Sequence, residues 1–123
     1  MAPRGFTPKL GYDLLFAASA QALQDLARDP KRLNAQLGML GVLHTWSRTL
    51  VFHPHIHYLI PGGGLSLDER TWISSGKKFF LPFQPLANRF RTLFSQKLKK
   101  QAPELHAQIP EKIWTQRWNL NIE

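Results

Sequence analysis

The clearest periodic pattern in the chain lies between residues 12 and 29. Apolar side chains recur there every three or four residues, and this spacing predicts one buried stripe of a helix. The stripe consists of Leu15, Ala18, Ala22, Leu23 and Leu26. Pro30 follows where a helix should stop. Residues 1–11 contain two prolines and two glycines, so we expect an irregular lead-in before the helix.

Two short apolar runs, residues 37–46 and 51–60, predict strands joined by a turn at residues 47–50. If that turn is centred between Thr49 and Leu50, His44 lies directly opposite His55 in the antiparallel pair. A one-residue slip would turn His44 to the other face. The stretch PGGG, residues 61–64, is expected to end the second strand and turn the chain.

The remainder of the chain predicts further elements of both kinds, at residues 70–74 (a short strand), 77–83 (an edge strand or extended connection), 85–101 (a helix), 103–109 (a short helix or turn) and 112–122 (a last strand). Helices mixed with hairpin strands indicate an α+β fold with an antiparallel sheet. The length of 123 residues predicts a single domain.

Composition and charge narrow the function. The chain has no cysteine, which excludes disulfide frameworks and Cys-based metal sites and fits a cytoplasmic protein. We find no secretory signal and no apolar stretch that could cross a membrane. The net charge is +8. The segment from Lys77 to Lys100 contains seven basic residues and no acidic residue. This field suits a polyanion such as nucleic acid, although a solvated helix face would have the same composition.

Three histidines occupy alternate positions in HPHIH, residues 53–57, so a strand would place them on one face. Pro54 cannot donate to a strand ladder, so the regular strand is expected to begin at His55. We therefore predict His55 and His57 as metal ligands and His44 as the third, while His53 supports them or contacts DNA. Three imidazoles suit Zn, Mn, Ni, Co or Fe better than Ca, and an open site favours catalysis. A polar surface face is the alternative.

His55-Ile56-His57, preceded by Pro54 and followed by an apolar strand, matches the histidine–hydrophobic–histidine (HUH) motif of single-strand DNA nickases. The wider stretch VLHTWSRTLVFHPHIHYLIPGGGLS, residues 42–66, resembles the two-tyrosine transposases of bacterial rolling-circle insertion sequences. The likeness extends over roughly residues 6–122. The triplet alone is a weak signal, whereas LHTW, HPHIH, PGGGLS and FFLP in this order are specific.

The resemblance implies an HUH-endonuclease-like antiparallel sheet with helices packed on one face. It also implies that His55 and His57, with His44, hold a divalent metal, usually Mg or Mn. In this family the metal polarises a phosphodiester of single-stranded DNA. A tyrosine then attacks the phosphorus and forms a 5′-phosphotyrosine, which conserves the bond energy for strand transfer. The implied partners are single-stranded DNA and transposon ends, with no membrane.

The chain departs from the family in its tyrosines. The family's catalytic pair lies downstream of the HUH motif, whereas this chain contains only Tyr12 and Tyr58. Tyr58 adjoins His57 and should point to the opposite face, and Tyr12 begins the first predicted helix. We therefore expect residues 1–123 to be a partial transposase domain, incomplete at the C-terminus, with no catalytic residue of its own and no nicking activity alone.

Basic and aromatic side chains are the expected DNA contacts. The candidates are Trp46, Arg48, Lys77, Lys78, Arg89 and Arg91. Two other functions stay open at this point: a DNA-binding remnant without catalysis, and a three-His metal hydrolase acting on a small molecule. The concentrated basic charge favours DNA over a small molecule.

Overall fold

The computed structural model of the protein describes residues 7–46, 52–74 and 83–116. The chain forms two compact units, residues 1–23 with 81–123 and residues 24–80, and each is described separately. Its helices, together with strands that pair antiparallel, confirm the α+β prediction. The expectation of a single domain stays a prediction. The predicted edge segment 77–83 lies outside the described residues except for Phe83.

Helix α1 (Pro8–Arg28) begins earlier than the sequence pattern suggested, so the predicted lead-in of residues 1–11 was too long. The Thr7 side-chain oxygen accepts a hydrogen bond from the Leu10 N–H at 3.1 Å, as expected of a helix N-cap. Pro8 then occupies the first helical position, where its missing N–H costs nothing. The proline that suggested an irregular segment is a helix-start signal here.

The first unit contains the N-terminal part of α1 together with α2 (Phe83–Gln101), α3 (Pro103–Gln108) and α4 (Glu111–Thr115). Helices α2 and α3 confirm the predictions for residues 85–101 and 103–109. Leu14 of α1 shares a buried cluster with Leu98 and Ala102. Partly buried side chains from α1 to α4 pack against this cluster: Leu10, Phe94, Leu105, Ile109 and Trp114.

The strand predicted for residues 112–122 was wrong in its described part, because α4 begins there directly after Pro110. Burial of Trp114 favours the helical turn. Its ring lies 5.2 Å from the His106 ring in a stacked arrangement and 6.5 Å from the Phe94 ring. His106 also lies within hydrogen-bond distance of the Ser95 hydroxyl, at 2.9 Å, which connects α3 to α2.

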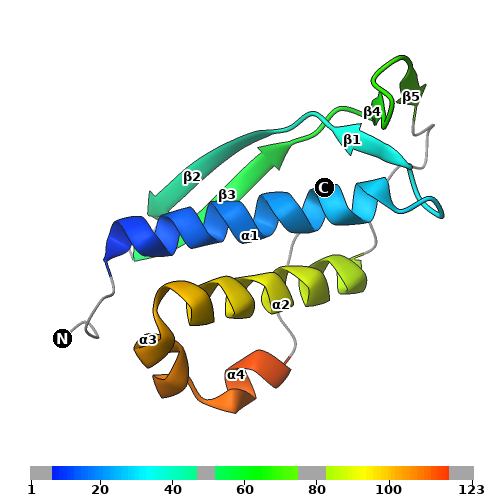
Figure 1. The fold of residues 1–123 in the computed structure, drawn as a ribbon. Helices are drawn as coiled ribbons and strands as arrows, with labels where there is room; N and C mark the ends of the chain where they lie inside the picture. The colour runs from blue at the N-terminus through cyan, green and yellow to red at the C-terminus, as the bar shows by residue number, and fades with distance from the viewer. Residues whose placement is uncertain (1–6, 47–51, 75–82, 117–123) are drawn as a thin grey trace. The chain divides into compact units, whose positions relative to one another are not determined.

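The second unit contains two antiparallel sheets (Figure 1). One sheet pairs β2 (Leu40–Trp46) with β3 (Phe52–Leu59), which confirms the predicted hairpin strands. The other has the order β1-β4-β5, formed by β1 (Ala35–Leu37), β4 (Gly63–Ser66) and β5 (Trp72–Ser74). Strand β5 confirms the short strand predicted at residues 70–74. The single sheet that the sequence suggested is replaced by two.

The β2–β3 ladder ends, and the β1–β4 ladder begins, on either side of Pro61. Leu37 pairs with Gly64 and Leu40 pairs with Leu59, so two residues on one side lie opposite four on the other. Proline has no N–H to donate to a ladder, and the Gly63 N–H instead donates to the Pro61 carbonyl at 2.8 Å. The predicted break is therefore confirmed at residues 61 and 62. Gly63 and Gly64, which were predicted to belong to it, are the first residues of β4.

Strand β1 is an edge strand of its sheet, and the side chain of Gln24 covers part of its open edge. The Gln24 amide nitrogen donates to the Leu37 carbonyl at 2.8 Å, and its oxygen accepts from the Leu37 N–H at 2.9 Å. One side-chain amide thus satisfies both backbone groups of Leu37, in the way a neighbouring strand would. This pairing fixes β1 to the last turns of α1.

The close approach of strands at Gly64 gives a testable prediction. A Cβ at Gly64 would collide with the Gln36 carbonyl oxygen, whereas a Cβ at Gly38 would meet nothing within 4 Å. Gly64→Ala is therefore expected to lower the free energy of unfolding by about 1–3 kcal/mol, and Gly38→Ala is expected to leave it unchanged or raise it by up to about 1 kcal/mol. Urea unfolding followed by far-UV circular dichroism measures both. Equal stability of the two variants would contradict the β1–β4 pairing.

Candidate functional site

The β2–β3 pair places the predicted metal ligands on neighbouring backbone positions. His44 lies directly opposite His55, as the sequence predicted, and Val42 lies opposite His57. Directly opposed residues share a face of the ladder, and so do residues two apart on one strand. By register, His44, His55 and His57 therefore lie on one face of the hairpin.

The opposite face of the same hairpin carries Leu43, Ile56 and Tyr58. Ile56 pairs with Leu43 and Tyr58 pairs with Gly41, and all of these residues are half-buried. Tyr58 is consequently separated from His57 by the plane of the ladder, which confirms the predicted orientation. Tyr12, the other tyrosine, is half-buried in α1 of the first unit.

A bulge interrupts the hairpin next to the histidines. Regular pairing runs from Leu40↔Leu59 to His44↔His55, and the next pair is Trp46↔Phe52. Thr45 therefore lies opposite two residues, His53 and Pro54. Because Pro54 cannot donate a hydrogen bond, the regular ladder is interrupted by a bulge at this position. The regular strand resumes at His55, which agrees with the predicted separation of His53 from the other histidines.

The histidine face is open along its described part. Leu40 is 63% exposed, Val42 47% and Leu59 73%, and the His57 side chain is exposed as well. Leu59 and Val42 border His57, one along its own strand and one across the ladder. Apolar side chains thus form one end of a face whose other end carries imidazoles.

The register fits a metal site made by this set of histidines. Imidazole nitrogens on adjacent antiparallel strands come from Cβ atoms about 4.5–5.5 Å apart, which is within reach of a shared cation. Among the side chains that the structure describes, no three His, Asp or Glu residues come together as a metal site. The side chains of His44, His53 and His55 lie outside that set, since only their backbone is described.

The structure describes the predicted DNA contacts to different extents. Arg48, Lys77 and Lys78 lie outside the described residues, and Trp46 is described by its backbone alone, at the end of β2. Arg89 is exposed on α2. Arg91 is half-buried and donates to the Gln116 carbonyl at 2.7 Å, so it has a structural role at the end of α4 that the sequence did not indicate.

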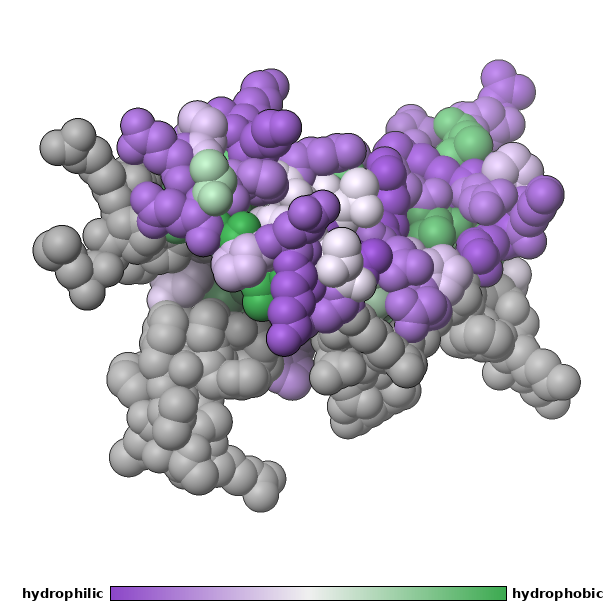
Figure 2. All heavy atoms as spheres, turned by 90° about the horizontal axis from the view of Figure 1, so that it is seen from below, coloured by the Kyte–Doolittle hydropathy of each residue, from purple (hydrophilic) through white to green (hydrophobic). Residues whose placement is uncertain are grey.

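The electrostatic character of α2 agrees with the charge pattern of the sequence. This helix carries five basic residues and no acidic residue, and Lys99 and Lys100 occupy its last turn. Figure 2 shows a face of the molecule that is largely hydrophilic, with small and separate apolar areas. No helix in the described part of the chain is long and apolar enough to cross a membrane.

Sequence reasoning missed two features of the hairpin that the register reveals. Val42 and Leu59 border His57, although the same pairing rule that aligned His44 with His55 would have found Val42. The bulge at His53 was signalled only by Pro54, and its partner Thr45 had no signal in the residue pattern.

Known proteins similar to this chain are transposases. A "Putative transposase y4qJ" from Sinorhizobium fredii is 47% identical over 91 residues, which cover 74% of this chain and 23% of that protein. A "Transposase for insertion sequence element IS801" from Pseudomonas savastanoi pv. phaseolicola is 37% identical over 59 residues, covering 48% of this chain and 14% of that protein. The chain thus spans less than a quarter of the length of these relatives. No solved structure matches it.

The family comparison covers the site itself. Residues 38–123, which include the whole β2–β3 hairpin and α2, match the model of the family described as "Putative transposase". This match extends over more than half of the chain. The protein therefore belongs to the "Putative transposase" family.

Proposed function

We propose that these 123 residues are the metal-binding part of a rolling-circle transposase of the two-tyrosine HUH type, which binds and nicks single-stranded DNA. The observation that carries the proposal is the register of β2 and β3, with His44 opposite His55 and His57 two residues further along the same face. Membership of a transposase family and the similarity to an insertion-sequence transposase support DNA transposition as the context.

In this proposal His55, His57 and His44 hold a divalent cation, Mg or Mn. The bound ion would neutralise charge that grows on the phosphate oxygens during strand cleavage. The hairpin contributes a rigid spacing of the imidazoles, because each is fixed by a paired backbone. The open face around His57 leaves room for a DNA strand to approach. Arg89, which is exposed on α2, contacts a phosphate of the bound strand.

The covalent step needs a nucleophile that these residues do not supply. Tyr58 lies on the face of the hairpin opposite the histidines, and Tyr12 is half-buried in α1. We therefore propose that this chain binds single-stranded DNA without forming a phosphotyrosine. A binding module of this kind is the second candidate function, and the position of Tyr58 favours it for the isolated chain. The third, a small-molecule hydrolase, has no support from the family match.

Metal affinity tests the register directly. His55→Gln combined with His57→Gln is expected to weaken Mn²⁺ binding at least about tenfold, because two of three ligands are lost. Val42→His is expected to strengthen it, since residue 42 faces His57 across the ladder and would add a fourth imidazole. Isothermal titration calorimetry with Mn²⁺, and with Zn²⁺ for comparison, measures both changes.

Two controls accompany the metal titration. Tyr58→His places a new imidazole on the other face of the same strand, and His106→Gln removes one from the first unit. Both are expected to leave the affinity unchanged, with far-UV circular dichroism verifying the fold. An affinity that rises equally in Val42→His and Tyr58→His would refute the placement of the site.

The absence of a nucleophile is tested with an oligonucleotide. The purified chain, incubated with labelled single-stranded DNA and Mn²⁺ and then denatured, is expected to show no covalent protein–DNA adduct by gel electrophoresis. A full-length relative serves as the positive control. An adduct on this chain that disappears in Tyr12→Phe or Tyr58→Phe would overturn the binding-only assignment.

A further inference from the structure

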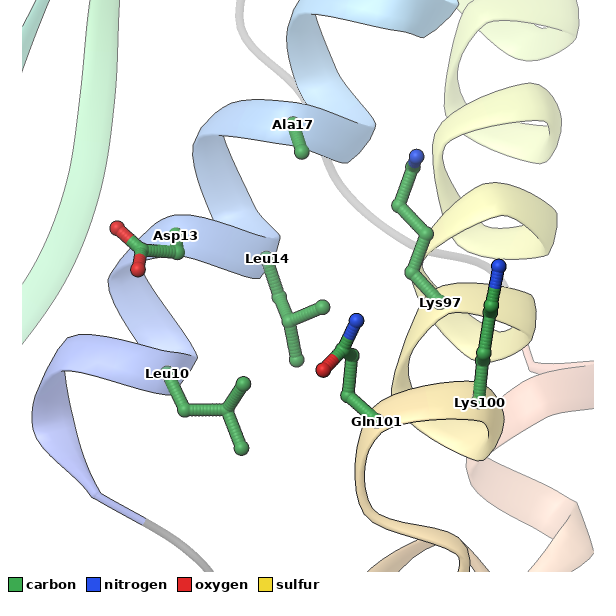
Figure 3. Close-up of a pocket in the computed structure, with 7 residues that line it drawn as sticks. All are labelled: Leu10, Asp13, Leu14, Ala17, Lys97, Lys100 and Gln101. Carbon is green, nitrogen blue, oxygen red and sulfur yellow. The ribbon is translucent and has the colours of Figure 1, made fainter.

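An open depression lies on the first unit, between residues of α1 and α2 (Figure 3). Its volume is about 340 Å³, at the lower end of the range for small-ligand pockets. Four residues of α1 and three of α2 line it: Leu10, Asp13, Leu14, Ala17, Lys97, Lys100 and Gln101. None of them belongs to the histidine face or to the predicted DNA contacts.

One wall of the depression is cationic. Lys97, Lys100 and Gln101 are three and four residues apart, which places them on one side of α2, and Figure 3 shows the two lysines extending in similar directions. Among the residues that the structure describes, neither lysine has a hydrogen bond or ion pair. Two ammonium groups are therefore available to the same ligand, and the helix that carries them has no acidic residue.

The single carboxylate in the lining does not neutralise these lysines. Asp13 accepts a hydrogen bond from the Lys9 ammonium at 2.8 Å, and this bond raises the pKa of Lys9. In Figure 3 the Asp13 side chain points away from α2. Its charge is thus paired within α1, and the charged lining residues, two lysines and one aspartate, have a positive sum.

The other wall is apolar. Leu14 is buried to 5% exposure and belongs to the core cluster, and Leu10 is half-buried beside it. Ala17 is exposed and small, so it keeps this wall open. A site with ammonium groups on one wall and hydrocarbon on the other suits a ligand that has a phosphate next to a flat apolar group. A nucleotide of single-stranded DNA has this chemistry.

We propose that this depression is a second contact for single-stranded DNA, with one phosphodiester at Lys97 and Lys100 and the adjoining base against Leu10, Leu14 and Ala17. The proposal rests on the proposed function, because it assumes that the chain binds single-stranded DNA. It adds a site on α1 and α2 to the histidine face of the β2–β3 hairpin.

The lysines could instead stabilise the helix, and a control variant distinguishes this role from DNA binding. Cations in the last turn of a helix stabilise it through the helix dipole, and Lys99 and Lys100 both lie there. Lys99 is exposed and does not line the depression. It is therefore the matched control: substitution of Lys99 removes the same charge from the same turn without touching the site.

The experiment is a salt series of fluorescence anisotropy titrations with labelled twelve-nucleotide oligothymidylate. Lys97→Ala combined with Lys100→Ala is expected to weaken binding about tenfold or more at 0.1 M salt. It should also reduce the slope of log K against log salt by about 1.4, the value for two lost phosphate contacts. Lys99→Ala is expected to change the affinity less than about twofold. Arg89→Ala, outside the depression, reports the proposed α2 contact in the same series.

A second pair of variants leaves the lysines intact. Ala17→Glu introduces a carboxylate at an exposed position of the depression and is expected to weaken binding severalfold, whereas Ala107→Glu introduces it at an exposed position of α3 and is expected to have little effect. This pair decides the matter if the double lysine variant loses its helical circular dichroism signal. Displacement of the oligonucleotide by millimolar thymidine monophosphate would assign the depression to free nucleotides instead of a strand and would overturn the proposal.

The outcomes separate the two proposals. If the wild-type chain does not bind oligothymidylate, the proposed function and this inference both fail. If it binds and the double lysine variant behaves like Lys99→Ala, with Ala17→Glu like Ala107→Glu, the depression is not a DNA contact and the proposed function is unaffected. Selective loss in the depression variants supports the second site.

Discussion

Antiparallel pairing of β2 with β3 is the constraint on which the functional reading of this protein depends. The side chains of a strand alternate between two faces, so a shift of one residue would turn His44 to the face opposite His55 and His57. The observed register instead aligns His44 with His55 and Val42 with His57. His44 thus shares a face with His55 and His57, which lie eleven and thirteen residues further along the chain.

Two prolines delimit the regular part of this pairing. Pro54 lies in the bulge opposite Thr45, and Pro61 lies where the β2–β3 ladder gives way to the β1–β4 ladder. Neither residue can donate a backbone hydrogen bond, so each interrupts the ladder where it stands. The pairs from Leu40↔Leu59 to His44↔His55 lie between them, and the predicted ligands occupy the end of this segment next to the bulge. Bulges commonly reorient side chains beside functional sites.

The sequence predicted these features where one local rule decides them. The register predicted for the hairpin agrees with the pairs from Leu40↔Leu59 to His44↔His55, and apolar spacing placed the start of α2 to within two residues. The pair Trp46↔Phe52, beyond the bulge, departs from that register. Prediction from the sequence failed where two local rules favour different structures for the same residues. Pro8 suggests a loop when it is considered alone, whereas in the structure it follows the N-cap Thr7 and begins a helix. The alternation of side chains around Trp114 suggests a strand, whereas in the structure the Trp114 ring stacks on His106 from a helical turn. The depression beside Lys97 is lined by residues of α1 and α2, which are far apart in the sequence, so no local pattern could have predicted it.

The most direct test of a metal site on the histidine face is a ¹H–¹⁵N correlation spectrum of the chain titrated with substoichiometric Mn²⁺. A paramagnetic ion broadens the signals of the nuclei nearest to it, so the spectrum locates the ion without any substitution. We expect broadening centred on residues 42–44 and 55–57, which lie opposite one another in β2 and β3. Broadening centred on Asp or Glu residues elsewhere, with the hairpin signals unchanged, would contradict it.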